Sequence, residues 1–270
     1  MECSRGTKKP NGNCDRAEFG GSLPIQCVGD WAKDKHDYLR RYISATWGVR
    51  SKFLESAGSR PAGGAAFVDL FGGPGRCCVR GVKVELIDGS PLIALGHKEA
   101  PFTKVIVCDF DAENVEALRA RTAHCSDRTV VVEGDCHSKI NEVVAAIPPH
   151  GFNIAFIDPF NSDQLRIDTI TKLAAVKRMD FIINFPTGDK KRNYEREGFS
   201  SPGDVVCGIK DLRKRLEPFG YRNEQVRDMA VRNSKHNILY HLVFASKDPK
   251  GNKIWKDITK NESSGQRNLF

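Results

Sequence analysis

The chain of 270 residues carries 42 Lys and Arg residues against 34 Asp and Glu residues, which gives a formal net charge of +8. This length allows one large domain with a sizeable core, and the positive charge suits anionic partners such as nucleic acid. No apolar run reaches the ~20 residues that cross a bilayer. Nine cysteines without paired C-x-x-C motifs argue against a disulfide scaffold and a zinc site. We therefore expect a cytoplasmic protein with reduced thiols and no membrane partner.

The first 57 residues divide into two predicted parts. Residues 1–29 are polar and lack the apolar core of a signal peptide, so we expect a flexible leader. In residues 30–57 apolar side chains such as Leu39 and Ile43 recur at helical spacing, which predicts an amphipathic helix that Asp30 caps. The Gly- and Pro-rich stretch that follows ends this helix.

Short apolar runs then alternate with helical patterns. The predicted strands cover residues 65–71, 104–111, 129–135, 152–160 and 179–186. The predicted helices cover residues 90–100, 112–124, 137–147 and 163–176, the first with Ser90 as N-cap and Pro91 as its first residue. Residues 76–89 are expected to form a long loop. Apolar strands that alternate with helices predict a Rossmann-like α/β fold, a parallel sheet with helices on both faces.

The C-terminal third follows a different pattern. A predicted helix at 209–220 precedes two predicted strands, 222–233 and 237–247, whose short connection makes them antiparallel neighbours. A parallel sheet that finishes in an antiparallel hairpin is the outline of class I methyltransferases. We therefore expect a seven-stranded, mostly parallel sheet in a single domain over residues 30–258, with a polar tail at 259–270.

A glycine-rich turn follows the first predicted strand in 66-AFVDLFGGPGR-76. Gly72, Gly73 and Gly75 would tolerate positive φ and a close approach of the backbone to a ligand. The turn matches neither G-x-G-x-x-G nor the phosphate-binding loop G-x-x-x-x-G-K-[ST]. Because Asp69 precedes it, the turn favours a cationic ligand such as S-adenosylmethionine, whose amino acid end carries an ammonium group. The alternative is a tight turn without a ligand.

Acidic residues also end the next two predicted strands. Asp109 stands where ribose hydroxyls of a nucleoside cofactor would find an acceptor, and Asp135 where an adenine amino group would. The alternative for Asp135 is capping of the next helix, a role that also suits Asp111. Because the carboxyl ends of parallel strands share one rim, three acidic ends in succession favour the cofactor.

The fourth predicted strand ends in 156-FIDPFN-161. Pro159 fixes φ and turns the chain, which leaves the Asp158 carboxylate to accept hydrogen bonds from an amino group. Phe160 could stack on a planar base, a contact worth about 1–3 kcal/mol. An amine held in this way could attack a sulfonium methyl group. The alternative is a Phe160 side chain packed at the strand end.

The fifth predicted strand ends in 182-IINFPTGDKKRN-193. Asn184 and Phe185 are expected to face the same rim as the acidic residues. The basic loop that follows, with Lys190, Lys191 and Arg192, suits the phosphates of a nucleic acid. Its alternative is an ordinary solvated loop.

These motifs together resemble the three-Cys-motif partner (TcmP) proteins, a prokaryotic family with a class I methyltransferase-like fold. The matching stretches are WAKDKHDYLRRYISATW, FVDLFGGPGR, GSPLIAL, VCDFD, FIDPF, IINFP and YHLVFASKDPKGNKIW, which span about residues 31–258. The family is named after a Cys-bearing protein encoded by a neighbouring gene, so Cys3, Cys14 and Cys27 are not identified with that motif.

The resemblance implies S-adenosylmethionine binding, with S-adenosylhomocysteine as the product. The candidate cofactor-binding residues are Asp69, Phe71, Gly72, Gly73, Gly75, Asp109, Phe110, Asp135 and Cys136. D-P-F-N resembles the D-P-P-[YF] signature of enzymes that methylate exocyclic amines of nucleobases, with one proline and with Asn161 in place of the aromatic residue. Asn161 is therefore grouped with the candidate substrate-binding residues, and the substrate stays open.

Two functions are consistent with these patterns. The first is an S-adenosylmethionine-dependent methyltransferase that acts on an exocyclic amine of RNA or DNA, where Asp158, Pro159 and Phe160 position the amine. Such direct transfer needs alignment of the amine and the methyl group, and neither a covalent nucleophile nor a metal. The second is a methyltransferase-like protein that binds a nucleoside ligand, or a partner such as a Cys-motif protein, without catalysis. Methyl transfer to a protein or a small molecule is a third reading.

Overall fold

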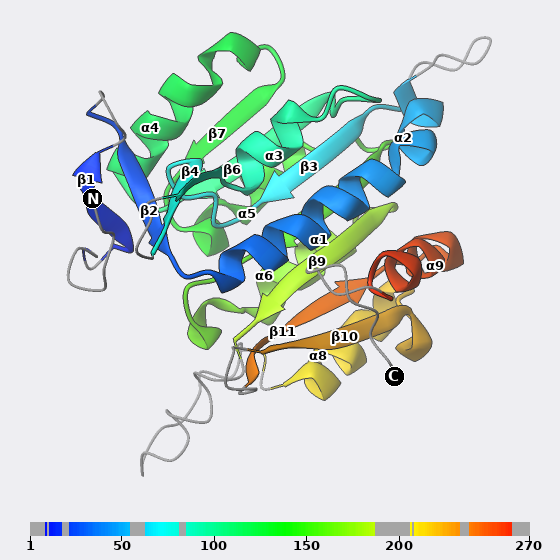
Figure 1. Cartoon of the computed structure of the whole chain (residues 1–270). Coiled ribbons are helices and arrows are strands. Elements are labelled where there is room, and N and C mark those ends of the chain that lie inside the picture. Colours follow the sequence, from blue (N-terminus) through cyan, green and yellow to red (C-terminus); the bar gives the residue numbers. More distant parts are fainter. Residues whose placement is uncertain are drawn as a thin grey trace.

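The computed structural model describes residues 9, 11–17, 22–54, 63–80, 85–186, 206, 208–232 and 238–260. They form a large sheet covered by helices on both faces, with a smaller sheet beside it (Figure 1). Within these residues no helix combines the length and the apolar character that a membrane span requires.

The large sheet has seven strands in the order β10-β11-β9-β8-β3-β6-β7. β11 runs antiparallel to β10 and β9, and the other neighbouring pairs are parallel. The strands are β3 (Ala65–Asp69), β6 (Lys104–Asp109), β7 (Thr129–Glu133), β8 (Phe152–Ile157), β9 (Met179–Phe185), β10 (Val226–Arg232) and β11 (Ile238–Ala245). This topology confirms the predicted class I methyltransferase arrangement with its C-terminal antiparallel hairpin.

Helices cover both faces because successive residues of the central strands point to opposite sides. Ala66 and Val68 pack into one core with α5, α6 and α8, whereas Ala65 and Phe67 pack into the other core with α1, α3, α4 and α9. The helices are α1 (Trp31–Ala45), α2 (Trp47–Leu54), α3 (Ser90–Gly96), α4 (Ala112–Thr122), α5 (Cys136–Ala145), α6 (Ile167–Ala174), α8 (Ile209–Leu216) and α9 (Pro249–Ile258). Short 3-10 turns cover Ala123–Cys125, Ser162–Gln164, Glu217–Phe219 and Asn223–Gln225.

A second sheet overturns two predictions. Residues 1–29, predicted as a flexible leader, contain β1 (Asn13–Ala17) and β2 (Pro24–Val28), and residues 76–89, predicted as a loop, contain β4 (Arg76–Val79) and β5 (Glu85–Asp88). These four strands pair in the order β1-β2-β4-β5, with β2 and β4 parallel. They enclose a small apolar core, whose members are Cys14, Ile25, Cys27 and Cys78, with Leu86 packed against it. Burial of these alternating side chains is what orders the segments.

Two helix starts also differ from the prediction. The predicted helix over residues 30–57 is two helices, α1 and α2, which meet at Thr46. Asp30 has helical backbone angles and makes no capping bond, and its carboxylate instead pairs with Lys33 at 3.0 Å. Ser90 is the first residue of α3 and Gly89 is the N-cap, while Pro91 stands in the first turn as expected.

Candidate active site

The carboxyl ends of four neighbouring parallel strands bring the predicted acidic residues to one edge of the large sheet. Asp69 and Asp109 end β3 and β6, and Asp158 directly follows β8. These side chains are close enough to influence each other, since the charges of Asp158 and Asp109 both raise the pKa of Asp69. Asp69, Asp109 and Asp158 therefore lie at the same edge of the sheet.

The glycine turn is close-packed against its surroundings. Gly73 and Gly75 have φ values of +58° and +83°, in the region where side chains are strained. A Cβ atom on Gly72 would lie 2.0 Å from the Val107 side chain, and one on Gly73 would lie 3.2 Å from Gln26 Oε1. The Gly73 amide donates a hydrogen bond to Asp109 Oδ2 at 2.7 Å, which ties the turn to β6.

Asp69 is the most deeply buried acidic group of the site. Its Oδ1 accepts a hydrogen bond from the Phe71 amide at 3.1 Å, whereas its Oδ2 has no hydrogen-bond partner among the described residues. Burial raises the pKa of Asp69 to about 7, although the Phe71 amide and the nearby Ser90 hydroxyl, which makes no hydrogen bond to Oδ2, act in the opposite direction. A buried carboxyl oxygen without a partner fits an ammonium group from a ligand.

Asp109 is fixed by three donors. Its Oδ1 accepts hydrogen bonds from the Asp111 amide and from Asn114 Nδ2, both at 3.0 Å, and Gly73 holds its Oδ2. Asn114 was missed by the sequence reasoning, although a polar residue on the apolar stripe of α4 was a signal. Phe110, which directly follows Asp109, is 80% exposed, so its ring lies at the edge of the candidate site.

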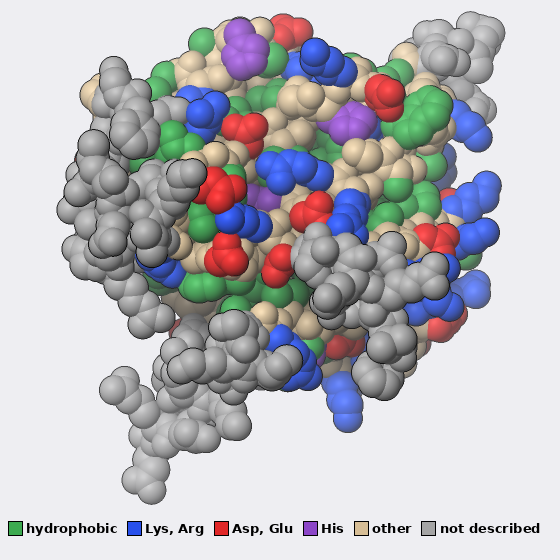
Figure 2. All heavy atoms as spheres, viewed as in Figure 1, with side chains coloured by type: hydrophobic (Ala, Val, Ile, Leu, Met, Phe, Trp, Pro, Cys, Tyr) green, Lys and Arg blue, Asp and Glu red, His purple; other side chains and the backbone are tan. Residues whose placement is uncertain are grey.

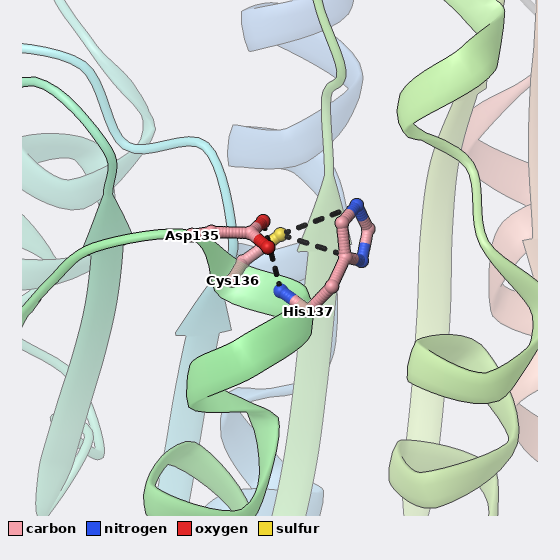
Figure 3. A group of neighbouring side chains, drawn as sticks. All are labelled: Asp135, Cys136 and His137. Atoms are coloured by element: carbon pink, nitrogen blue, oxygen red, sulfur yellow. Dashed lines mark hydrogen bonds between the residues drawn. The ribbon is translucent and has the colours of Figure 1, made fainter.

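Asp135 caps α5, the alternative considered for it. Its carboxylate accepts hydrogen bonds from the His137 amide at 3.2 Å and from the Ser138 hydroxyl at 3.1 Å. Figure 3 shows the Cys136 sulfur on the same side as this carboxylate, with the His137 ring facing it. Asp135, Cys136 and His137 each offer one atom that could bind a metal ion, and these three atoms lie within 4.8 Å of one another. Cys136 is buried, and burial raises the pKa of its thiol.

Asp158 is engaged by two side chains that converge from distant elements. Its Oδ1 accepts a hydrogen bond from Asn184 Nδ2 at 2.7 Å, and its Oδ2 forms an ion pair with Lys35 of α1. No local sequence pattern indicates this pair, because its two members are 123 residues apart. The neighbouring His36 is buried, and burial together with the charge of Lys35 lowers its pKa to about 3.

The residues after Asp158 form a turn that presents an aromatic ring. Phe160 is 63% exposed, which does not fit the alternative of a packed side chain. Its amide donates to Gln164 Oε1 at 2.7 Å. Asn161 caps the following turn, where its side-chain oxygen accepts hydrogen bonds from the Asp163 and Gln164 amides at 3.1 and 3.3 Å. Asn161 thus supports the shape of this loop.

The end of β9 partly follows the prediction. Asn184 lies at the rim through its bond to Asp158, and its Oδ1 has no partner among the described residues. The expectation that Phe185 faces the same rim was wrong, because alternation along the strand turns this side chain into the core with α6 and α8. Lys190, Lys191 and Arg192 lie outside the described residues.

Charges of both signs share the face of the molecule that α1 lines. Figure 2 shows Lys and Arg side chains interspersed with Asp and Glu side chains there. Several are paired across α1, for example Arg41 with Asp37 at 2.7 Å. The net positive charge is therefore not concentrated on this face.

Comparison with known proteins bears on the fold. The sequence matches no protein-family model and no curated protein. A Legionella pneumophila protein of the family described as DUF519 has a similar structure over 88% of this chain and 96% of its own, with a TM-score of 0.51 and 11% identity. The putative methyltransferase yhhF from Escherichia coli aligns over 68% of this chain and 78% of its own (TM-score 0.38, 13% identity).

A putative rRNA methylase from Clostridium thermocellum is also similar in structure. It aligns over 82% of this chain and 98% of its own, with a TM-score of 0.43 and 10% identity. Identities this low relate the chain to these proteins through its fold alone.

Proposed function

We propose that this chain is an S-adenosylmethionine-dependent methyltransferase that acts on an exocyclic amine of a nucleic acid base. The observation that carries the proposal is the edge where Asp69 and Asp158 meet. Asp69 Oδ2 is buried without a partner among the described residues, and the charge of Asp158 reaches it. One carboxylate suits the ammonium group of the cofactor, and the other suits the amine of a substrate.

The cofactor fits the residues of the glycine turn and of β6. Asp69 would accept the ammonium group, and Asp109, held in place by Gly73 and Asn114, would accept the ribose hydroxyls. When bound, S-adenosylmethionine supplies a methyl group on a positively charged sulfur. The exposed Phe110 ring at the rim is suited to cover the adenine. Asp135 would accept a hydrogen bond from the adenine amino group through an oxygen that also caps α5.

The substrate amine would be held at Asp158. Its carboxylate can accept a hydrogen bond from the amine and so orient the nitrogen lone pair toward the methyl group. The exposed Phe160 ring offers a stacking surface for the base. Asn184 anchors Asp158 Oδ1, and Lys35 balances the charge of the carboxylate and offers an ammonium group to phosphate.

A second function, ligand or partner binding without catalysis, is favoured by a specific observation. Both oxygens of Asp158 already have partners, Lys35 and Asn184, and Asn161 caps a turn where the comparable motif has an aromatic ring. In this reading the chain is a member of the TcmP family that assembles with a Cys-motif protein encoded by a neighbouring gene. A substrate amine would have to share an Asp158 oxygen with Lys35 or Asn184 for the first function to operate.

Replacement of Asp158 tests the proposal. We expect Asp158→Ala to abolish transfer of a labelled methyl group from S-adenosylmethionine to unmodified ribosomal RNA transcripts or unmethylated DNA. Cofactor affinity, measured by calorimetry, should stay within about threefold of the wild type, because Asp158 contacts the amine and not the cofactor. Asp163→Ala, a change in the same loop, serves as the control. Equal loss of transfer and of cofactor affinity in Asp158→Ala would contradict this role.

A further inference from the structure

The N-terminal strand pair lies against the glycine turn. β2 lies beside α4 and pairs with β4, which continues directly from the turn, and β1 pairs with the other edge of β2 (Figure 1). Gln26 of β2 pairs in register with Cys77 of β4, and its Oε1 is the nearest atom to the place where a Cβ on Gly73 would stand. This strand pair therefore forms one wall of the proposed cofactor site.

A chain of buried hydrogen bonds runs from β1 to the acidic end of β6. Asn13 is fully buried, and its Nδ2 donates to Asn114 Oδ1 at 2.7 Å. Asn114 Nδ2 in turn donates to Asp109 Oδ1 at 3.0 Å. Asn13 and Asn114 are 101 residues apart, so their bond depends on the packing of the small sheet onto the large one.

The Asn13 bond holds the Asn114 amide in place. An amide side chain presents a donor on one side and an acceptor on the other. Asn114 Oδ1 accepts from Asn13 while Asn114 Nδ2 donates to Asp109, so both ends of this amide are engaged. Without Asn13, Asn114 Oδ1 would lose its donor, and Asn114 would hold the Asp109 carboxylate less firmly.

Asn13 carries a cost in stability as well as a partner. Asn13 Oδ1 is buried and has no hydrogen-bond partner among the described residues, a condition that lowers stability. An apolar side chain would remove this cost but would leave Asn114 Oδ1 without the donor that Asn13 supplies. The polar residue at position 13 is therefore tied to Asn114 and, through it, to Asp109.

We propose that Asn13 is a positioning residue of the cofactor site, acting through Asn114 to aim the Asp109 carboxylate at the ribose hydroxyls of the bound nucleoside. This inference rests on the proposed function, since it assigns Asn13 a part in binding that cofactor.

Calorimetric titration of the full chain with S-adenosylhomocysteine tests the proposal. We expect Asn13→Ala to bind about five- to tenfold more weakly than the wild type, the effect of losing one hydrogen bond from the network that holds Asp109. Asn11→Ala is the control, because Asn11 lies in the turn just before β1. Among the described residues its side chain accepts only from the Asn13 backbone amide, and it donates to Asp111 Oδ2 at 2.9 Å and not to Asp109 or Asn114. Asn13→Leu, which keeps the branching at Cγ and has no polar atom, should behave like Asn13→Ala. It replaces Asn13→Ala if that variant does not fold.

Two further readouts separate positioning from a general loss of structure. The 2′-deoxyribose analogue of S-adenosylhomocysteine should bind more weakly than the parent to the wild type, and this preference should shrink in Asn13→Ala. A loosened fold would weaken both ligands equally. In an Asn114→Ala background, Asn13→Ala should change affinity by less than about twofold, because its route to Asp109 is already removed.

The outcomes distinguish this proposal from the proposed function. A wild type that binds neither ligand contradicts the proposed function itself. A wild type that binds, while Asn13→Ala and Asn13→Leu match Asn11→Ala in affinity and in ribose preference, overturns the role of Asn13 and leaves the proposed function intact.

Discussion

At the scale of single residues, Asp69 shows how the site departs from what stability alone would favour. A fully buried carboxyl with one unpartnered oxygen destabilises the fold whenever it is ionised. Burial raises its pKa from an ordinary value of 3.8 to about 7, so the folded chain binds this proton more tightly than the unfolded chain does. The contribution of Asp69 to the free energy of unfolding is therefore most favourable at low pH and decreases as the pH rises from about 4 to about 7.

Asp69→Asn should remove this pH dependence. The amide keeps an oxygen for the Phe71 amide and never ionises, so the variant should gain stability over the wild type at pH 8. We expect the gain to be about 1–3 kcal/mol larger at pH 8 than at pH 5. Urea unfolding of the wild type and the variant at the two pH values measures this gain. If the free energies of unfolding of the two proteins differed by the same amount at pH 5 and pH 8, the raised pKa would be contradicted. Asp180, whose pKa burial also raises, is unchanged in both chains and cancels in the comparison.

Position along the strands was enough to predict from the sequence which acidic residues lie together at the candidate site. Asp69, Asp109 and Asp158 follow apolar runs, and parallel strands bring their ends to one rim. Asn13 and Lys35 could not be found in this way, because each contacts the site across more than a hundred residues. Such contacts depend on how the elements pack, and a local pattern does not contain that information.

At the scale of elements, helix starts depend on backbone conformation as well as on residue type. Asp248 has extended angles before α9, and its carboxylate accepts a hydrogen bond from the Lys250 amide at 2.8 Å. Asp30 stands before α1 with helical angles and makes no such bond. The sequence therefore predicted a cap at Asp30 that the helical backbone angles there rule out.

The two aspartates should respond differently to the same substitution. We expect Asp248→Ala to lower the free energy of unfolding by about 1 kcal/mol, the usual effect of losing an N-cap. Asp30→Ala should change it by less than about 0.5 kcal/mol, because it loses only an exposed pair with Lys33. Chemical denaturation of the two variants provides the comparison, and equal losses would show that residue type alone sets these helix starts.

At the scale of the whole molecule, the large sheet was predictable and the small sheet was not. Each central strand of the large sheet is buried along its whole length and mostly apolar, since both of its faces are covered. The strands of the small sheet are four or five residues long, and β2 pairs with β4 from a segment about fifty residues away. So short an alternation, with cysteines as its apolar members, resembles a loop until the partner strand is known.

The C-terminal helix α9 belongs to the same cooperative unit as α1 and β11. Trp255 stacks on Phe244 with ring centroids 4.7 Å apart and meets Tyr42 at 5.9 Å. Trp255→Ala should therefore lower the free energy of unfolding by about 3–5 kcal/mol. Trp47, which is 52% exposed, is the control. Trp47→Ala should change the free energy of unfolding by less than about 0.5 kcal/mol. Denaturation that shows α9 unfolding before the rest would contradict this account.

The central claim is that the glycine turn and the acidic residues around it hold a nucleoside cofactor. Calorimetric titration of the wild type and of Asp109→Ala with S-adenosylmethionine and S-adenosylhomocysteine tests it most directly. We expect micromolar binding of both ligands to the wild type and its loss in the variant, because Asp109 is the acceptor that the turn and Asn114 hold in place. No binding to the wild type, or unchanged binding to Asp109→Ala, would contradict the claim and make partner binding the leading function.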